Sequence, residues 1–234
     1  MIIGFMNRTL IEILKRREDI SDYLFHFTKG VNAKDTLISI ITQKKIKDTK
    51  GSGYICFSES PLTMLSPMFS FFKQWDSPMY APYGIGVKKD YLYQLGGKPV
   101  IYGDSYDFKI LPEELKWRFV QYSPGENDFT WLREWRLPLP LLELSYENCF
   151  FIVDTNSDFW GMQELFMDLN DIDVDAEPED GGIRTTYFGY FSRKYKVISL
   201  EEISKLTSIT KNQLLNILES EKEEEGIFLG STWE

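Results

Sequence analysis

The segment Leu24-Phe25-His26-Phe27-Thr28 gives the clearest indication of the fold. It is short, apolar and aromatic, which is typical of a β-strand. Asn32 follows at a position suited to capping a helix. Apolar residues then recur at the spacing of one buried helix face: Ala33, Leu37, Ile40 and Ile41. We therefore expect a core strand that leads directly into an amphipathic helix.

The chain beyond this unit mixes short strands with helices. Strands are expected at 54–58, 83–87, 99–102, 131–137 and 148–153, and helices at 62–72, 89–95, 113–122 and 158–169. Large and charged residues alternate in 131–137, so Glu134 should share a strand face with Leu132 and Arg136. The pattern predicts a fold of the α+β class.

The two ends and the most acidic segment have their own patterns. Residues 7–23 mix apolar and charged residues as an amphipathic helix does. The segment 168–180 carries seven acidic residues and is expected to form a solvated loop. Capping-box spacings at Ser199 with Glu202 and at Thr210 with Gln213 predict further helices. We therefore divide the chain into a domain of residues 1–199 and a helical appendage of residues 200–234.

Composition narrows the classes of function. The net charge of −10 argues against broad nucleic-acid binding, because such binding needs Lys and Arg to neutralise phosphates. One histidine and two cysteines are too few ligands for a zinc site, so no metal is expected. Cys56 and Cys149 lie in apolar stretches, which suits reduced, buried thiols. We expect a cytoplasmic protein, because the apolar runs are too short to span a bilayer and the N-terminus does not read as a secretory signal.

Four motifs occur in a fixed order along the first 140 residues. They are Tyr-Leu-Phe-His-Phe-Thr at 23–28, Ile-Cys-Phe-Ser-Glu-Ser-Pro-Leu at 55–62, Tyr-Gly-Ile-Gly-Val-Lys-Lys at 83–89 with Gly-Gly-Lys-Pro-Val-Ile-Tyr at 96–102, and Asp-Phe-Thr-Trp-Leu-Arg-Glu-Trp-Arg at 128–136. Together they resemble a family of bacterial abortive-infection phage-resistance proteins, the AbiGi group. Proteins of this group are labelled antitoxins, so the resemblance implies a role in antiphage defence.

The same motifs more distantly resemble DarT-type ADP-ribosyltransferases. The shared features are an aromatic-His-Phe-Thr strand, a helix, a strand ending in Ser-x-Ser-Pro-Leu, and a glutamate on a late strand. The resemblance implies a mixed or antiparallel, split β core flanked by helices, with NAD as the substrate. These enzymes also use an arginine ahead of or within the second motif, where this chain has Lys47, Lys50 and Glu59.

Glu134 and His26 are the candidate catalytic residues. Cleavage of the bond between nicotinamide and ribose builds positive charge on the ribose, which a nearby carboxylate stabilises, and the carboxylate can also help to deprotonate an acceptor. Glu134 occupies the place of the late glutamate. His26, the single histidine, could hydrogen-bond the ribose. The alternatives are a solvated ion pair of Glu134 with Arg136 and a histidine satisfied within the core.

A set of polar and aromatic residues is expected to bind NAD: His26, Thr28, Ser58, Tyr83 and Arg136. Thr28 follows His26 by two positions and so shares its strand face. Ser58 lies at a strand-to-helix junction, where backbone N–H groups collect and can bind phosphate, although a simple helix cap is the alternative. Tyr83 could stack on nicotinamide or adenine.

Two hypotheses of function follow. The first is an NAD-dependent ADP-ribosyltransferase-like enzyme of antiphage defence, which modifies an acceptor or hydrolyses NAD. The second is a catalytically silent antitoxin or sensor that binds a partner toxin or phage protein. The missing arginine and the acidity favour the second hypothesis, because an acidic inhibitor associates quickly with a basic partner.

Overall fold

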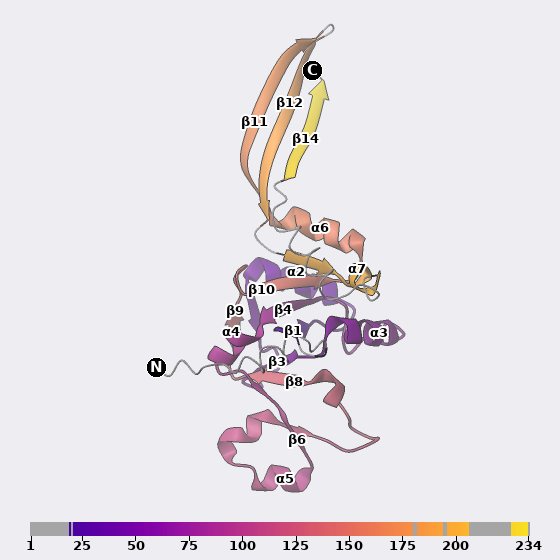
Figure 1. Ribbon diagram of the computed structural model, residues 1–234, viewed down its shortest axis with the longest axis vertical. Coiled ribbons are helices and arrows are strands. Elements are labelled where there is room, and N and C mark those ends of the chain that lie inside the picture. The colour runs from indigo at the N-terminus through magenta and orange to yellow at the C-terminus, as the bar shows by residue number, and fades with distance from the viewer. Residues whose placement is uncertain (1–18, 20, 180–181, 194–195, 206–225, 234) are drawn as a thin grey trace, which may run out of the picture.

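A seven-stranded mixed sheet forms the centre of the protein. The computed structural model describes residues 19, 21–179, 182–193, 196–205 and 226–233 (Figure 1). The strands of this sheet are β1 (Tyr23–Phe27), β3 (Ile55–Ser58), β4 (Gly84–Lys88), β5 (Lys98–Pro99), β8 (Glu134–Leu137), β10 (Cys149–Val153) and β13 (Lys196–Ser199). Their order is β13-β10-β4-β1-β3-β8-β5, and only β10 and β13 are parallel. The expected α+β class is confirmed.

The sheet is weakly paired at its middle. β1 pairs with β4 at five positions, from Tyr23 with Lys88 to Phe27 with Gly84. On its other side, β1 pairs with β3 at one position alone, Phe25 with Ser58. The two halves of the sheet therefore diverge between β1 and β3.

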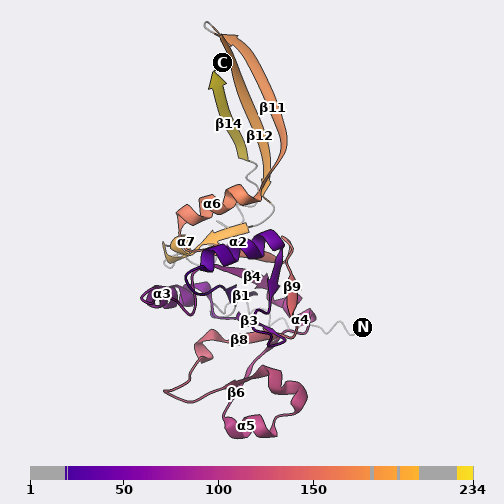
Figure 2. The ribbon, with the colours of Figure 1, turned by 180° about the vertical axis from the view of Figure 1, so that it is seen from behind.

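Helices cover the two faces of this sheet. We call one side the α2 face, because α2 (Ala33–Gln43), α4 (Lys89–Gln94) and α6 (Asn156–Phe166) lie against it. The other side is the α3 face, covered by α3 (Leu62–Phe72) and α7 (Leu200–Lys205). Successive strand residues alternate between the faces. On β1, Leu24 accordingly packs in the core under α2, and Phe25 packs with Leu65 and Phe69 of α3. Figure 2 shows the body from the side of α2.

The capping of the first described helix differs in one detail from the expectation. Asn32 occupies the cap position of α2, but its side chain makes no capping hydrogen bond. Its backbone carbonyl accepts hydrogen bonds from both the N–H and the hydroxyl of Thr36, each at 2.9 Å. The predicted helix at 7–23 lies outside the described residues as far as residue 18, and Tyr23 already belongs to β1.

Two elements near the candidate glutamate were predicted wrongly. Residues 113–122 are not one helix, because a 3₁₀ helix, η1 (Glu113–Arg118), is followed by strand β7 (Phe119–Gln121). The strand predicted at 131–137 begins only at Glu134. The 3₁₀ helix η2 (Thr130–Leu132) precedes it, and Arg133 adopts a left-handed backbone with φ of 46°. That conformation turns the chain, so the strand alternation cannot extend back to Leu132.

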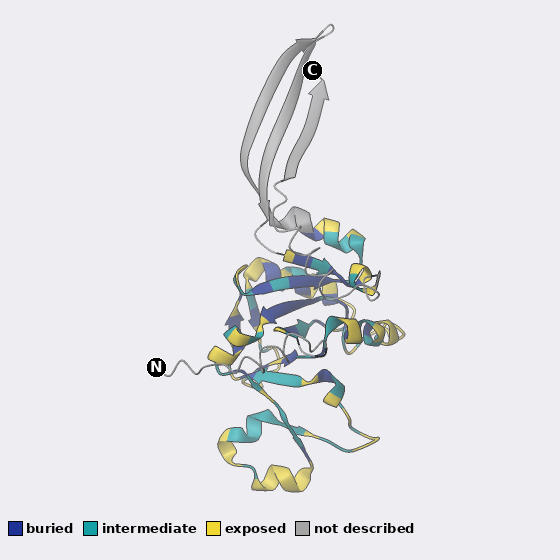
Figure 3. Cartoon of the chain, in the orientation of Figure 1, coloured by how far each residue is buried: buried dark blue, intermediate teal, exposed yellow. Residues whose placement is uncertain are grey.

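Smaller elements surround the main sheet. β2 (Lys45–Lys47) pairs with β9 (Leu141–Glu143). β6 (Ile101–Gly103) pairs in parallel with β7, and α5 (Ser105–Ile110) lies between them in sequence. Figure 1 shows this excursion, residues 101–121, projecting from the body next to β8. Figure 3 shows that α5 is largely exposed whereas the central strands are buried.

A second sheet replaces the expected acidic loop and part of the expected helical appendage. It contains β11 (Met167–Glu179), β12 (Gly182–Arg193) and β14 (Gly226–Trp233), and Figures 1 and 2 show it extending away from the body. Acidic and apolar residues alternate from 171 to 177, which is strand periodicity that the high charge concealed. Of residues 200–234, 200–205 are helical, 226–233 form a strand, and 206–225 lie outside the described residues.

The helices of the described residues include none that is long and apolar enough to cross a membrane.

Candidate functional site

The Glu134 carboxylate is held in a fixed position at the start of β8. Arg136, two residues along the same strand, donates from Nε to Glu134 Oε1 at 2.8 Å. The two side chains are 14% and 12% exposed, so this is a largely buried ion pair and not the solvated one of the alternative interpretation. Arg136 Nη1 also donates to the carbonyls of Trp117 and Phe119, at 2.7 and 3.0 Å. The pair lies on the α3 face, because Glu134 is in register with Ser58, which is in register with Phe25.

Residues of β3 and of the turn before it complete the surroundings of this pair. Cys56 is in register with Arg136, and the guanidinium lies 4.4 Å from the centre of the Tyr54 ring. Burial raises the pKa of the Cys56 thiol to about 12, and the neighbouring Glu134 carboxylate adds to the rise. Cys56 is therefore a neutral neighbour of Glu134 at physiological pH. Both cysteines are free thiols, as expected. The expectation that both are buried is correct for Cys149 and wrong for Cys56, which is exposed.

Two tyrosine hydroxyls also approach Glu134. Burial raises the pKa of Tyr80 to about 12, with a further contribution from the Glu134 charge. The Tyr102 hydroxyl accepts a hydrogen bond from the Glu134 backbone N–H at 3.4 Å and donates to the Phe129 carbonyl at 3.2 Å. The Glu134 charge thus acts on neutral hydroxyl and thiol groups nearby, which can exchange hydrogen bonds with a polar ligand.

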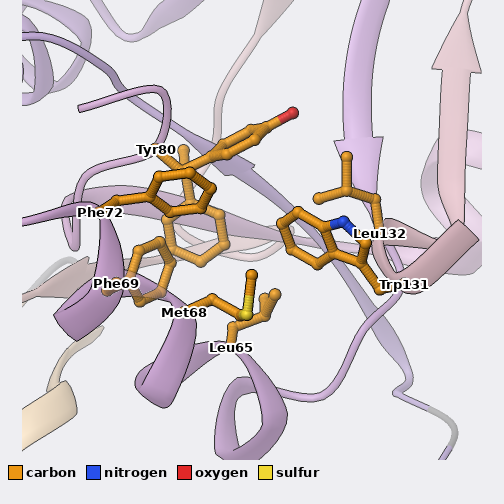
Figure 4. Close-up of a pocket in the computed structure, with 8 residues that line it drawn as sticks. Leu65, Met68, Phe69, Phe72, Tyr80, Trp131 and Leu132 are labelled. Carbon is orange, nitrogen blue, oxygen red and sulfur yellow. The ribbon is translucent and has the colours of Figure 1, made fainter. Parts of the chain in front are cut away.

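An aromatic pocket adjoins this cluster on the α3 face. It is lined by Phe27, Leu65, Met68, Phe69, Phe72, Tyr80, Trp131 and Leu132, and its cavity is about 10 Å³. Figure 4 shows Phe69 and Phe72 on one side and Trp131 on the other. The Tyr80 and Trp131 rings meet edge to face with centroids 5.9 Å apart. The cavity holds roughly one water molecule, so these rings must separate before a planar ligand can enter.

His26 lies on the other face of the sheet. Its Nδ1 is 2.9 Å from the Cys56 carbonyl, and since a carbonyl can only accept, Nδ1 carries the proton. Burial lowers the pKa of His26, while this hydrogen bond acts in the opposite direction, and the net shift is downward. The ring also lies 5.7 Å from that of Phe57, whose side chain belongs to the core of the α2 face. Strand β3, whose Cys56 carbonyl His26 binds, therefore lies between His26 and Glu134.

Thr28 and Tyr83 gather on the same face as His26. The Thr28 hydroxyl is buried and donates to the Tyr83 carbonyl at 2.8 Å. The Tyr83 hydroxyl donates to Asp158 Oδ2 of α6 at 3.0 Å, and Asp158 also accepts from Lys34 Nζ at 2.5 Å and from Thr155 Oγ1 at 3.0 Å. These bonds join α2, β4 and α6, so Tyr83 and Thr28 act as anchors between elements.

Ser58 is on the α3 face, but its hydroxyl is already used. It is buried, donates to the Leu132 carbonyl at 2.6 Å and accepts from the Ser60 N–H at 3.2 Å. The adjacent Glu59 accepts from Lys89 Nζ at 2.9 Å and from Trp135 Nε1 at 2.8 Å. Hydrogen bonds between protein groups thus stabilise the junction after β3.

The structure therefore divides the expected site into two groups. Glu134, Arg136 and Ser58 lie on the α3 face, and His26, Thr28 and Tyr83 lie on the α2 face.

Sequence reasoning did not single out the remaining neighbours of Glu134, which are Tyr54, Cys56, Tyr80 and Tyr102. Cys56 could have been found from strand alternation, because it shares parity with Ser58 within the second motif. Tyr80 lies in the loop between α3 and β4, which has no periodic pattern, so no signal identified it.

Comparisons with protein-family models, with curated proteins and with solved structures each find no match to this chain.

Proposed function

We propose that this protein is an NAD-consuming, ADP-ribosyltransferase-like enzyme of antiphage defence, with Glu134 as its catalytic residue. The observation that carries the proposal is the Glu134–Arg136 pair: a carboxylate oriented by an arginine, largely shielded from water, and bordered by an aromatic pocket. A fixed carboxylate in a shielded site is what stabilises an oxocarbenium-like ribose most strongly.

The residues around Glu134 fit the parts of NAD that react. Tyr80 and Trp131 offer aromatic faces to the nicotinamide ring once they separate, which would place the ribose near the carboxylate. Glu134 stabilises the positive charge on the ribose as nicotinamide leaves, and then accepts the proton of the attacking acceptor or water. The split between β1 and β3 agrees with the divided β core that the family resemblance implies.

His26 has a structural role in this enzyme and not the ribose-binding role expected from the sequence. His26 acts through the Cys56 carbonyl and so holds β3 in place, instead of contacting the ribose. Ser58 likewise has a structural role, because its hydroxyl bonds to the Leu132 carbonyl. The acidic composition favours a protein or small-molecule acceptor.

The direct test is to incubate the purified protein with NAD, with and without extract of phage-infected cells. Release of nicotinamide, or an ADP-ribose mass added to an acceptor, is the expected result. A Glu134→Gln variant should lose both this reaction and protection of cells against phage. If wild-type protein releases no nicotinamide under either condition and Glu134→Gln still protects, the enzymatic proposal is wrong.

Exposed apolar side chains favour a second candidate, a silent antitoxin or sensor that binds a basic toxin or phage protein. Met64 and Phe71 of α3, with Trp75 and Met79 after it, are between 49% and 68% exposed. An apolar patch on a protein of net charge −10 suits a partner with an apolar centre and a basic rim. Affinity purification from phage-infected cells should then return one basic partner in stoichiometric amount, and Trp75→Ser should abolish its recovery.

A further inference from the structure

Arg136 contacts three separate parts of the protein at once. Nε donates to Glu134, both N–H groups of Nη1 are directed to backbone carbonyls of η1 and β7, and the guanidinium plane lies on Tyr54 of the turn before β3. Three of the five N–H donors of the side chain are thus used by the protein. With 12% of its surface exposed, this side chain is built into the fold.

The carbonyls that Arg136 binds belong to the excursion of residues 101–121. Trp117 is in η1, and Phe119 begins β7. The Phe119 ring in turn packs on Phe108 of the exposed helix α5, with centroids 5.1 Å apart. A continuous set of contacts therefore runs from α5 through Phe119 and Arg136 to the Glu134 carboxylate.

We infer that Arg136 is a positioning residue that orients the Glu134 carboxylate and ties it to the 101–121 excursion, and that it does not bind NAD. Its catalytic consequence rests on the proposed function, whereas the structural tie to the excursion can be tested without any activity. Because guanidinium stays charged at all accessible pH values, titration of Arg136 itself does not break the tie.

The geometry separates this role from that of a cofactor ligand. An arginine that binds a phosphate needs its planar, bidentate edge free. In Arg136 the Nε–H goes to Glu134 and Nη1 is fully used by the two carbonyls. Lysine cannot replace it, since an ammonium has no planar fork with which to reach the carboxylate and both carbonyls together.

The kinetic experiment compares Arg136→Ala, Arg136→Lys and a matched control, Arg118→Ala. Arg118 belongs to η1, and within the described part of the chain its side chain donates to the Pro99 carbonyl at 2.9 Å and not to Glu134. Both Arg136 variants should lower kcat for nicotinamide release by about 100-fold, with KM for NAD changed by less than about three-fold. Arg118→Ala should keep wild-type kcat. Methylguanidinium should restore part of the kcat of Arg136→Ala and none of that of Glu134→Gln.

A second measurement does not depend on activity. Hydrogen exchange by mass spectrometry should show faster exchange in both 113–121 and 134–137 for Arg136→Ala, and unchanged exchange in 134–137 for Arg118→Ala. If wild-type protein does not cleave NAD, the proposed function fails and hydrogen exchange alone decides this inference. Unchanged exchange at 113–121 in Arg136→Ala, a raised KM with kcat retained, or full activity of Arg136→Lys would each overturn it.

Discussion

The two faces of the central sheet use their polar side chains differently. On the α2 face, Thr28, Tyr83 and Asp158 are bonded to one another or to neighbouring helices, and their bonds join elements of the fold. On the α3 face, Glu134 is bonded to Arg136 but borders neutral hydroxyls and an aromatic pocket. A polar residue in a core motif can thus either join elements of the fold, as Thr28 does, or lie beside a pocket, as Glu134 does, and its hydrogen-bond partners distinguish the two cases.

The largest expected effect separates the faces by activity. Glu134→Gln should reduce nicotinamide release by about 1,000-fold, because the neutral amide cannot stabilise positive charge on the ribose. The protein should still unfold in one cooperative transition. Glu143→Gln, at an exposed position of strand β9, is the matched control and should retain full activity. Comparable losses in both variants would show that the effect is not specific to the α3 face.

On the α2 face, a substitution should lower stability and leave activity unchanged. Asp158→Asn should lower the free energy of unfolding by about 1–3 kcal/mol, because three hydrogen bonds to a carboxylate become weaker bonds to an amide. Nicotinamide release per folded molecule should not change. Asp76→Asn, at an exposed loop position, is the control and should leave stability unaltered. A loss of activity in Asp158→Asn without a loss of stability would remove the distinction between the faces.

The ionisation of Asp158 should also make the free energy of unfolding depend on pH. Burial alone would raise its pKa, but hydrogen bonds from Lys34, Thr155 and Tyr83 outweigh burial and hold the pKa below its usual value. A carboxyl whose pKa is lower in the folded state stabilises the fold above the unfolded pKa of about 3.9 and loses that contribution as the pH falls. Wild-type protein should therefore lose more stability than Asp158→Asn between about pH 5 and pH 3, measured by urea denaturation.

A glycine on the α3 face tests how tightly that face is packed away from the pocket. A Cβ atom on Gly86 would lie 2.4 Å from Cζ of Phe150. Gly86→Ala should therefore destabilise the protein by about 1–3 kcal/mol through overpacking. Gly161→Ala in α6, where a Cβ would meet nothing within 4 Å, should instead stabilise it by about 0.5–1 kcal/mol. Equal effects at the two positions would mean that Phe150 moves aside without cost.

The smallest expected effect concerns His26. Its lowered pKa means that the unfolded chain binds a proton more readily. Stability is therefore complete above the unfolded pKa of about 6.5, falls as the pH drops from there toward the lower folded pKa, and levels off below it. The slope cannot exceed about 1.4 kcal/mol per pH unit. Since His26 is the single histidine, His26→Asn should remove the slope between pH 7 and pH 5. An identical slope in the variant would assign it to another group.

Several elements of the core could be predicted from the sequence because their signals are local. The helix at 62–72 has the predicted bounds, and strands β1, β3, β4 and β10 differ from prediction by one residue at most at either end. The predictions of secondary structure were wrong where the local sequence pattern does not reveal the backbone conformation. Arg133 takes a left-handed conformation that strand alternation cannot reveal, and high charge concealed the strand periodicity of β11.

The candidate site was less predictable than the fold. Strand alternation correctly put Glu134 with Arg136 and His26 with Thr28. It could not show that the two pairs lie on opposite sides of the sheet, because relative facing depends on the register of β1, β3 and β8.

The α+β class, most core strands, and a carboxylate and an arginine two residues apart on one strand could be predicted from the amino-acid sequence. Periodicity and side-chain chemistry are properties of a few neighbouring residues, so they can be read without the fold. Three contacts became known from the folded structure: Glu134 lies near Tyr80 and an aromatic pocket, and His26 bonds to the Cys56 carbonyl. The third is the bonding of Arg136 to the carbonyls of Trp117 and Phe119. These are contacts between distant segments, and strand register and loop packing, which no local pattern encodes, set them.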